Sequence, residues 1–189
     1  DYPIEVSTRN INLTVNTAKQ FHRTCPLDGV LTVGTDASQT VAAVADALNL
    51  PGIPFEVAER ATDKIKMRQV LQAKGVPVPA FRPIWTLEDC RQAIDDMPLP
   101  LVIKPCDNMG ARGVRKIESI DDLVPAFREA KEASISGKLI LEEFMEGVEL
   151  SLDALVYENE NHITGVADRM IERAPYYVEV GHTLPSILP

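Results

Sequence analysis

The segment from Leu99 to Gly113 constrains the fold more than any other part of the chain. Its apolar run at residues 101–103 predicts a short buried strand, and a single charged residue, Lys104, stands at the end of that strand. A turn with two glycines follows, and residues 114–117 predict a second strand. A cation beside a glycine-bearing turn is a plausible holder of a polyphosphate, because glycine lets backbone N–H groups approach the oxygens.

Composition narrows the classes of protein to consider. The 189 residues suit one domain or two small ones, and the net charge of -9 disfavours general nucleic-acid binding. No apolar run approaches the roughly 20 residues that span a bilayer, so we expect no membrane partner. The three cysteines are odd in number and widely spaced, which disfavours a disulfide framework or a zinc site and favours a reducing cytoplasm. Cys106 has no histidine placed nearby to activate it as a nucleophile.

The N-terminal part shows strand and helix patterns in alternation. Residues 4–7 and 30–34 predict strands, and residues 14–23 and 38–48 predict helices. This alternation favours an α/β layer with a parallel sheet. The turn after the second strand lacks the further glycines of a dinucleotide-binding fingerprint, which disfavours NAD. Because such a layer normally begins with another strand and helix, we expect the chain to be a fragment.

The remainder of the chain predicts an α+β arrangement. A helix opens at Thr62 and Asp63 and ends at Gly75, and the extended residues 76–79 indicate a boundary between compact parts. N-cap patterns at Thr86 and Ser119 predict helices at residues 87–96 and 120–133. Further strands are predicted at residues 139–141, 149–157 and 163–168, with a turn at 159–161.

Four motifs, in this order, resemble the ATP-grasp superfamily, in its branch of carbamoyl-phosphate synthase large chains and related carboxylate–amine ligases. They are Asp63-Lys64 with its following Gly75, the strand and glycine turn around Lys104, residues 141–151, and residues 179–185. The resemblance implies that residues 1–60 are part of the α/β domain that precedes the ATP-grasp domain. Residues 61–189 then form the N-terminal and central parts of the ATP-grasp domain itself.

The resemblance also implies a nucleotide site. Lys64 and Lys104 are implied to hold the phosphates of ATP, and the segment 107–113 to cover them. Of the adjacent acids Glu142 and Glu143, alternation turns one inward, and Glu142 is our choice as the hinge acid near adenine. The candidate cofactor-binding residues are Lys64, Lys104, Asp107, Asn108, Met109, Gly110, Ala111, Arg112, Gly113, Glu142, Glu143, the backbone of Phe144 and Met145 at the adenine edge, and Glu149 at the ribose.

The implied chemistry is ATP-dependent activation of a small carboxylate through an acyl phosphate, which an amine then attacks. The ligands for Mg²⁺ are expected beyond residue 189, so no metal ligand is assigned in this chain and we expect the fragment alone to be inactive. Arg169 and Arg173 suit an acyl phosphate or acceptor carboxylate, or are surface charges, and His182 suits a structural hydrogen bond. Two alternatives stay open: a nucleotide-binding or interaction module without catalysis, and a plain scaffold. Oligomeric state is open too, a homo-oligomer included.

Overall fold

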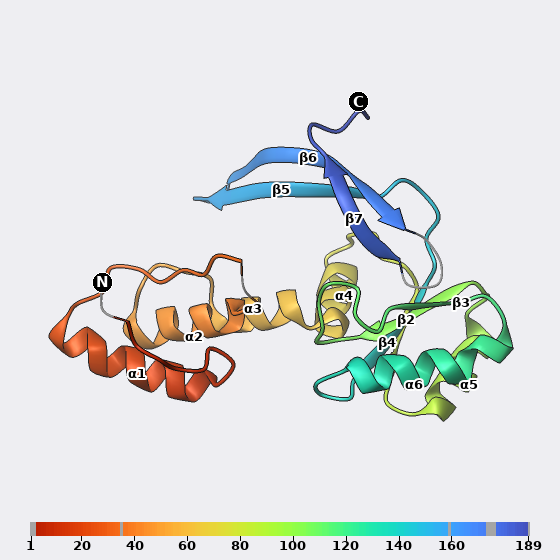
Figure 1. Ribbon diagram of the computed structural model, residues 1–189, viewed down its shortest axis with the longest axis horizontal. Coiled ribbons are helices and arrows are strands. Elements are labelled where there is room, and N and C mark those ends of the chain that lie inside the picture. The colour runs from red at the N-terminus through yellow and green to blue at the C-terminus, as the bar shows by residue number, and fades with distance from the viewer. Residues whose placement is uncertain (1–2, 35, 159, 173–176, 189) are drawn as a thin grey trace. The chain divides into compact units, whose positions relative to one another are not determined.

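The computed structural model describes residues 3–34, 36–158, 160–172 and 177–188. The chain divides into two compact units, Asp1–Pro77 and Val78–Pro189. Because the arrangement of the two units relative to each other is not determined, each is described by itself (Figure 1). The predicted turn residue Asn159 and the candidate Arg173 lie outside the described residues.

The first unit is helical over the residues that the structure describes. It contains α1 (Ile11–Thr24), α2 (Ser38–Leu48), α3 (Phe55–Thr62) and α4 (Lys64–Ala73). Successive helices pack on one another, and the small side chains of Ala42, Ala45 and Ala58 are buried. The predicted helix at residues 14–23 is confirmed within α1, and the predicted start of α4 is confirmed because the Asp63 carboxylate accepts hydrogen bonds from the N–H groups of Ile65 and Lys66.

The strands predicted for this unit are wrong. Residues 4–7 and the described residues of 30–34 form no strand, and Leu31 and Val33 are 79% and 82% exposed. An apolar run becomes a strand only where a neighbouring strand pairs with its backbone, and the described part of this unit offers none. The parallel layer is therefore not confirmed. The helix α3 was missed in the sequence, although Glu56 in its first turn is typical of a helix start.

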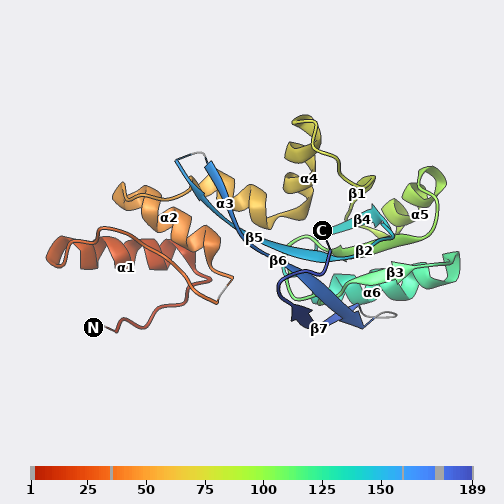
Figure 2. The same cartoon turned by 90° about the horizontal axis from the view of Figure 1, so that it is seen from above.

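The second unit contains a four-stranded antiparallel sheet in the order β1-β4-β2-β3. Its strands are β1 (Phe81–Ile84), β2 (Leu101–Pro105), β3 (Arg115–Ile117) and β4 (Leu139–Glu143). Two helices, α5 (Leu87–Asp96) and α6 (Leu123–Ala133), cover one face, as both views show (Figures 1 and 2), and a short 3₁₀ turn, Ile120–Asp122, leads into α6. The predicted strands at 101–103 and 139–141 and the helices at 87–96 and 120–133 are confirmed.

Alternation along these strands divides the sheet into two faces. Residues such as Leu101, Ile103 and Leu141 are fully buried and pack against α5 and α6 in the hydrophobic core. The alternate residues lie on the opposite side, which we call the distal face. The register places on it Phe81, Pro83, Val102, Lys104, Lys116, Ile140 and Glu142.

A second sheet completes this unit. It is an antiparallel meander of β5 (Leu150–Tyr157), β6 (Glu160–Glu172) and β7 (Val178–Thr183), with register shifts after Asp153 and after Met170. The predicted strands at 149–157 and 163–168 are confirmed, whereas β7 was not predicted. Gly181 interrupts the apolar pattern of β7, and its pairing with Met170 on β6 supplies the backbone partner that makes the strand.

Candidate functional site

The candidate site is built around an ion pair on the distal face. In the sheet, Glu142 on β4 lies directly opposite Val102 on β2, so Lys104, two residues further along β2, is its diagonal neighbour. The Nζ atom of Lys104 pairs with Oε2 of Glu142. The side chains are only 19% and 4% exposed, so both charges are held largely out of water. The residues predicted to hold the phosphates and to line the adenine end therefore contact each other directly.

Glu143 has a different role from its neighbour. It is exposed while Glu142 is 3% exposed, which confirms the predicted inward and outward alternation. The N–H of Glu143 donates to the carbonyl of Ala80 at 2.9 Å, and its carboxylate accepts from the N–H of Ala80 at 3.3 Å. These bonds fix the chain where it enters β1, and they give Glu143 a structural function.

The hinge segment after β4 is partly engaged in the fold. The N–H of Phe144 donates to the carbonyl of Pro100 at 3.2 Å. That donor is therefore occupied, and only other backbone groups of this segment are left to pair with a purine edge. Met145 follows with 68% of its surface exposed. The segment is thus fixed at Phe144 and exposed at the next residue.

The start of the glycine segment is anchored to the end of α6. The Asp107 carboxylate accepts hydrogen bonds from the Ser134 hydroxyl at 3.1 Å and from the N–H groups of Ile135 at 3.2 Å and Ser136. The Asn108 amide donates to the Ala133 carbonyl at 2.8 Å. Burial opposes ionisation of Asp107, but these hydrogen bonds outweigh it and hold the pKa of the carboxyl below its ordinary value. Asp107 and Asn108 therefore act as an anchor.

The remainder of the segment has a backbone that favours glycine. Gly110, Ala111 and Gly113 all have positive φ angles, of 66°, 57° and 72°. The guanidinium of Arg112 donates from Nε to Oδ1 of Asn108 and to the Met109 carbonyl, each at 3.0 Å. Gly113 is closely packed, because a Cβ atom there would lie 2.6 Å from the Cβ of Ala133. The part that can approach a ligand is therefore the turn around Gly110.

On the three-stranded sheet, Arg169 is surrounded by carboxylates. It donates from Nε to Glu179 at 2.9 Å and pairs through Nη1 with Glu149 at 3.4 Å. His182 Nε2 lies 3.2 Å from the other oxygen of Glu179. The predicted ribose acid, Glu149, is 52% exposed at its side chain, and that side chain pairs with Arg169 of β6. His182 lies in β7, and its expected structural hydrogen bond stays a prediction.

Lys64 belongs to the first unit, where it is the first residue of α4. All other predicted site residues among those described belong to the second unit. The joint action of Lys64 and Lys104 on a ligand therefore stays a prediction. Sequence reasoning also missed Lys116, which lies on the distal face. The sequence showed only that Lys116 stands in the predicted strand at residues 114–117, and its contacts come from residues elsewhere in the chain.

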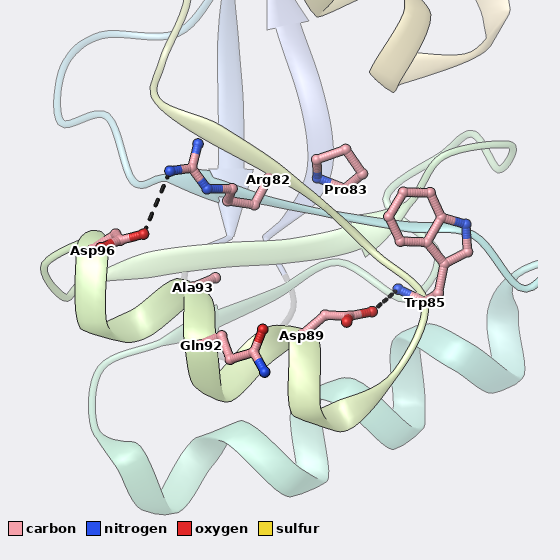
Figure 3. A pocket seen from close by; sticks show the side chains of 7 residues that line it. All are labelled: Arg82, Pro83, Trp85, Asp89, Gln92, Ala93 and Asp96. Carbon is pink, nitrogen blue, oxygen red and sulfur yellow. Dashed lines mark hydrogen bonds and ion pairs between the residues drawn. The ribbon is translucent and has the colours of Figure 1, made fainter.

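A cavity of about 240 Å³ lies away from these residues, between β1 and α5 (Figure 3). It is lined by Arg82, Pro83, Trp85, Asp89, Gln92, Ala93 and Asp96. Arg82 pairs with Asp96 at 3.5 Å, and Asp89 accepts from the N–H of Trp85 at 2.9 Å. The cavity contains none of the predicted site residues, and its polar groups bond at both ends of α5: Asp89 at the start and Asp96 at the last residue.

The residues that the structure describes hold no group of three or more histidine, cysteine, aspartate or glutamate side chains placed to bind a metal ion. Cys25, Cys90 and Cys106 form no disulfide, and burial raises the pKa of the Cys90 thiol to about 12. Within the same described residues, every helix is too short or too polar to cross a membrane.

Known proteins resemble this chain in sequence and in fold. The family profile described as "ATP-grasp domain" matches residues 61–188. The chain belongs to the ATP-grasp family. An uncharacterized protein, y4rH, of Sinorhizobium fredii is 29% identical over 150 residues, which are 75% of this chain and 30% of the relative. The carbamoyl phosphate synthase large chain of Corynebacterium glutamicum is 25% identical over 155 residues, which are 79% of this chain and 14% of the relative.

A solved structure extends the comparison to the fold. The L-amino acid ligase from Bacillus licheniformis superposes with a TM-score of 0.80 at 27% identity, over 95% of this chain and 42% of that ligase. The ATP-grasp family match confirms the predicted resemblance. This chain spans less than half the length of each of these proteins.

The glycines of this segment make a matched pair for mutation. Gly113→Ala is expected to lower the free energy of unfolding by more than about 2 kcal/mol. The strain at positive φ adds to the cost of overpacking, because the new Cβ atom would clash with Ala133. Gly110→Ala adds only the strain of about 1–2 kcal/mol, since no atom lies within 4 Å of its added Cβ. Urea denaturation of both variants measures the difference, and equal losses would contradict the close packing at Gly113.

The anchor at Asp107 predicts a dependence on pH. Because the folded-state pKa is lowered, the stabilisation is complete above the ordinary aspartate pKa of about 3.9 and is lost as the pH falls through the folded value. Asp107→Asn should cost about 1.5–3 kcal/mol at pH 7 and progressively less toward pH 2, as measured by denaturant unfolding. Asp95→Asn, on the exposed side of α5, is the control and should stay within about 0.5 kcal/mol. If Asp107→Asn lost the same free energy of unfolding at every pH, the stabilisation could not come from the ionised carboxylate of Asp107.

Proposed function

We propose that this chain is the nucleotide-holding part of an ATP-dependent carboxylate–amine ligase. The observation that carries the proposal is the Lys104 ammonium on the distal face, oriented by Glu142 and followed directly by the glycine segment. Family membership supports it, with a match that begins at residue 61. We accordingly assign residues 61–189 to the ATP-grasp part and residues 1–60 to the layer that precedes it.

The proposed reaction has two steps. A carboxylate oxygen of the substrate attacks the γ-phosphorus of ATP, the bond from that phosphorus to the β,γ-bridging oxygen breaks, and ADP leaves. An amine nitrogen then attacks the carbonyl carbon of the acyl phosphate, the C–O bond to the phosphate breaks, inorganic phosphate leaves with that electron pair, and the nitrogen gives up a proton to the departing phosphate or to water. Positioning and charge neutralisation supply the catalysis in such a reaction, because no covalent enzyme intermediate is formed.

The chain's own residues would act as follows. Lys104 neutralises charge on the phosphates, and Glu142 keeps its ammonium on the distal face. The turn around Gly110 covers the phosphates with backbone N–H groups. The exposed hinge at Met145 pairs with adenine, and Glu149 accepts from the ribose hydroxyls. Lys64 is proposed as the second cation at the phosphates.

A magnesium ion supplies further charge neutralisation in phosphoryl transfer of this kind when it is bound. The described residues do not present a set of ligands that fits such an ion. We therefore assign magnesium no ligand in this chain and derive no step through it.

The substrate pair is the finer part of the proposal. Likeness to a carbamoyl phosphate synthase large chain favours a substrate pair that yields carbamoyl phosphate, whereas likeness to an L-amino acid ligase favours a pair that includes an L-amino acid. Release of ADP, measured with each pair in turn on the protein that carries this chain, discriminates between them. ATP binding without ADP release for any pair would instead favour a nucleotide-binding module.

Lys104→Met provides the test of the site itself. Loss of the ammonium should weaken ATP binding to the 189-residue chain roughly 10- to 100-fold, the size of a lost charged hydrogen bond, in isothermal titration calorimetry. Lys19→Met, on the exposed surface of α1, removes the same charge and should leave the affinity unchanged. Circular dichroism checks that Lys104→Met is folded, because it leaves Glu142 without its lysine. Full ATP affinity in the folded variant would refute the assignment.

A further inference from the structure

Lys116 lies on the distal face of the four-stranded sheet, at some distance from Lys104. It stands opposite Val102, and Lys104 is two residues further along β2. With the usual spacing of strands and residues, the Cα atoms of the two lysines are about 8 Å apart. Phe144 continues the alternation of Ile140 and Glu142 toward the same end as Lys116. Lys116 therefore belongs to the end of the site that holds the hinge, away from the phosphate end.

The ammonium of Lys116 is held between an aromatic ring and a carboxylate. Its Nζ atom lies 4.2 Å from the centroid of the Phe144 ring and 2.7 Å from Oε1 of Glu118. The lysine side chain is only 17% exposed. A cation over a ring face at this distance is attracted by the ring quadrupole, and the attraction is greatest where water is excluded.

Phe144 has a second aromatic neighbour. The ring of Tyr177, directly before β7, is tilted by 55° to that of Phe144, with centroids 5.8 Å apart. This is a favourable aromatic geometry. Together with the hydrogen bond from the Phe144 N–H to Pro100, these contacts fix both the ring and the backbone of the hinge. Residues from β3, the hinge and the start of β7 thus meet at one side chain.

The surroundings keep Lys116 charged. The hydrogen bond to Glu118 contributes most, and the negative charges of Glu118 and Glu146 add to it, so the pKa of Lys116 is raised although burial opposes the charge. A neutral amine would not make the same contact with the ring. The contact therefore persists at neutral pH.

We propose that Lys116 is a positioning residue for the base end of the nucleotide slot: with Tyr177 it clamps the Phe144 ring, and so orients the hinge that receives the purine. This inference rests on the proposed function. It assigns Lys116 to recognition of the base and separates it from Lys104, whose ammonium serves the phosphates. A direct contact between Lys116 and the phosphates is the rival assignment.

A ligand with a base and a ligand without one distinguish a role of Lys116 at the base from a role at the phosphates. Lys116→Met in the 189-residue chain should weaken ATP binding roughly fivefold, the scale of a partly buried cation–π contact, and should leave binding of inorganic tripolyphosphate unchanged. Lys116→Arg should restore ATP binding, because a guanidinium also stacks on an aromatic face. Lys19→Met is the matched control for charge. Calorimetric titration with both ligands measures all four proteins.

Nuclear magnetic resonance tests the clamp without any nucleotide. The ε-methylene protons of Lys116 should resonate upfield of ordinary lysine values because of the Phe144 ring current, and Phe144→Leu should abolish that shift. Ordinary positions in the unaltered chain would overturn the clamp. Equal ATP affinity for Lys116→Met, or an equal loss for tripolyphosphate, would overturn the positioning role alone. Failure of the unaltered chain to bind ATP would overturn the proposed function, and the positioning role with it.

Discussion

The ion pair between Lys104 and Glu142 is the interaction on which the candidate site depends. It holds two charges largely out of water, and the cost of removing charges from water commonly equals or exceeds what their attraction returns. Such a pair is therefore weak support for stability. Its value is that it fixes a cation at a defined place on the distal face, beside a turn whose backbone can follow a polyphosphate.

The register of the sheet makes this pair. A slip of one residue would move Lys104 into the helix-covered core and turn Ile103 outward. The buried side chains of Leu101, Ile103 and Leu141 prevent such a slip, because they fill the space against α5 and α6. Stability thus resides mainly on one face of the sheet, and that face determines which side chains the other face presents. The glycine turn is positioned in the same way, because the hydrogen bonds of Asp107 attach its start to the residues directly after α6.

The sequence predicted those features of the fold that depend on residues close together in the chain, and it did not predict those that depend on distant residues. Strands at 101–103 and 139–141, the capped helices and the inward Glu142 depend on local alternation and local hydrogen bonds, and they were predicted correctly. The strand at 30–34 was wrong because a strand needs a neighbour that the pattern does not reveal. The anchor at Asp107 depends on residues far along the chain, and Lys116 reads as an ordinary surface lysine until its contact with Phe144 is known. These contacts are tertiary, and single-sequence patterns do not encode them.

A crystal structure of the 189-residue chain with a non-hydrolysable ATP analogue would test the account most directly. We expect the nucleotide to lie along the distal face, with its phosphates within hydrogen-bond distance of the Lys104 ammonium and its purine against the hinge at Phe144 and Met145. A nucleotide bound instead in the cavity between β1 and α5, or phosphates that leave Lys104 paired only with Glu142, would contradict it.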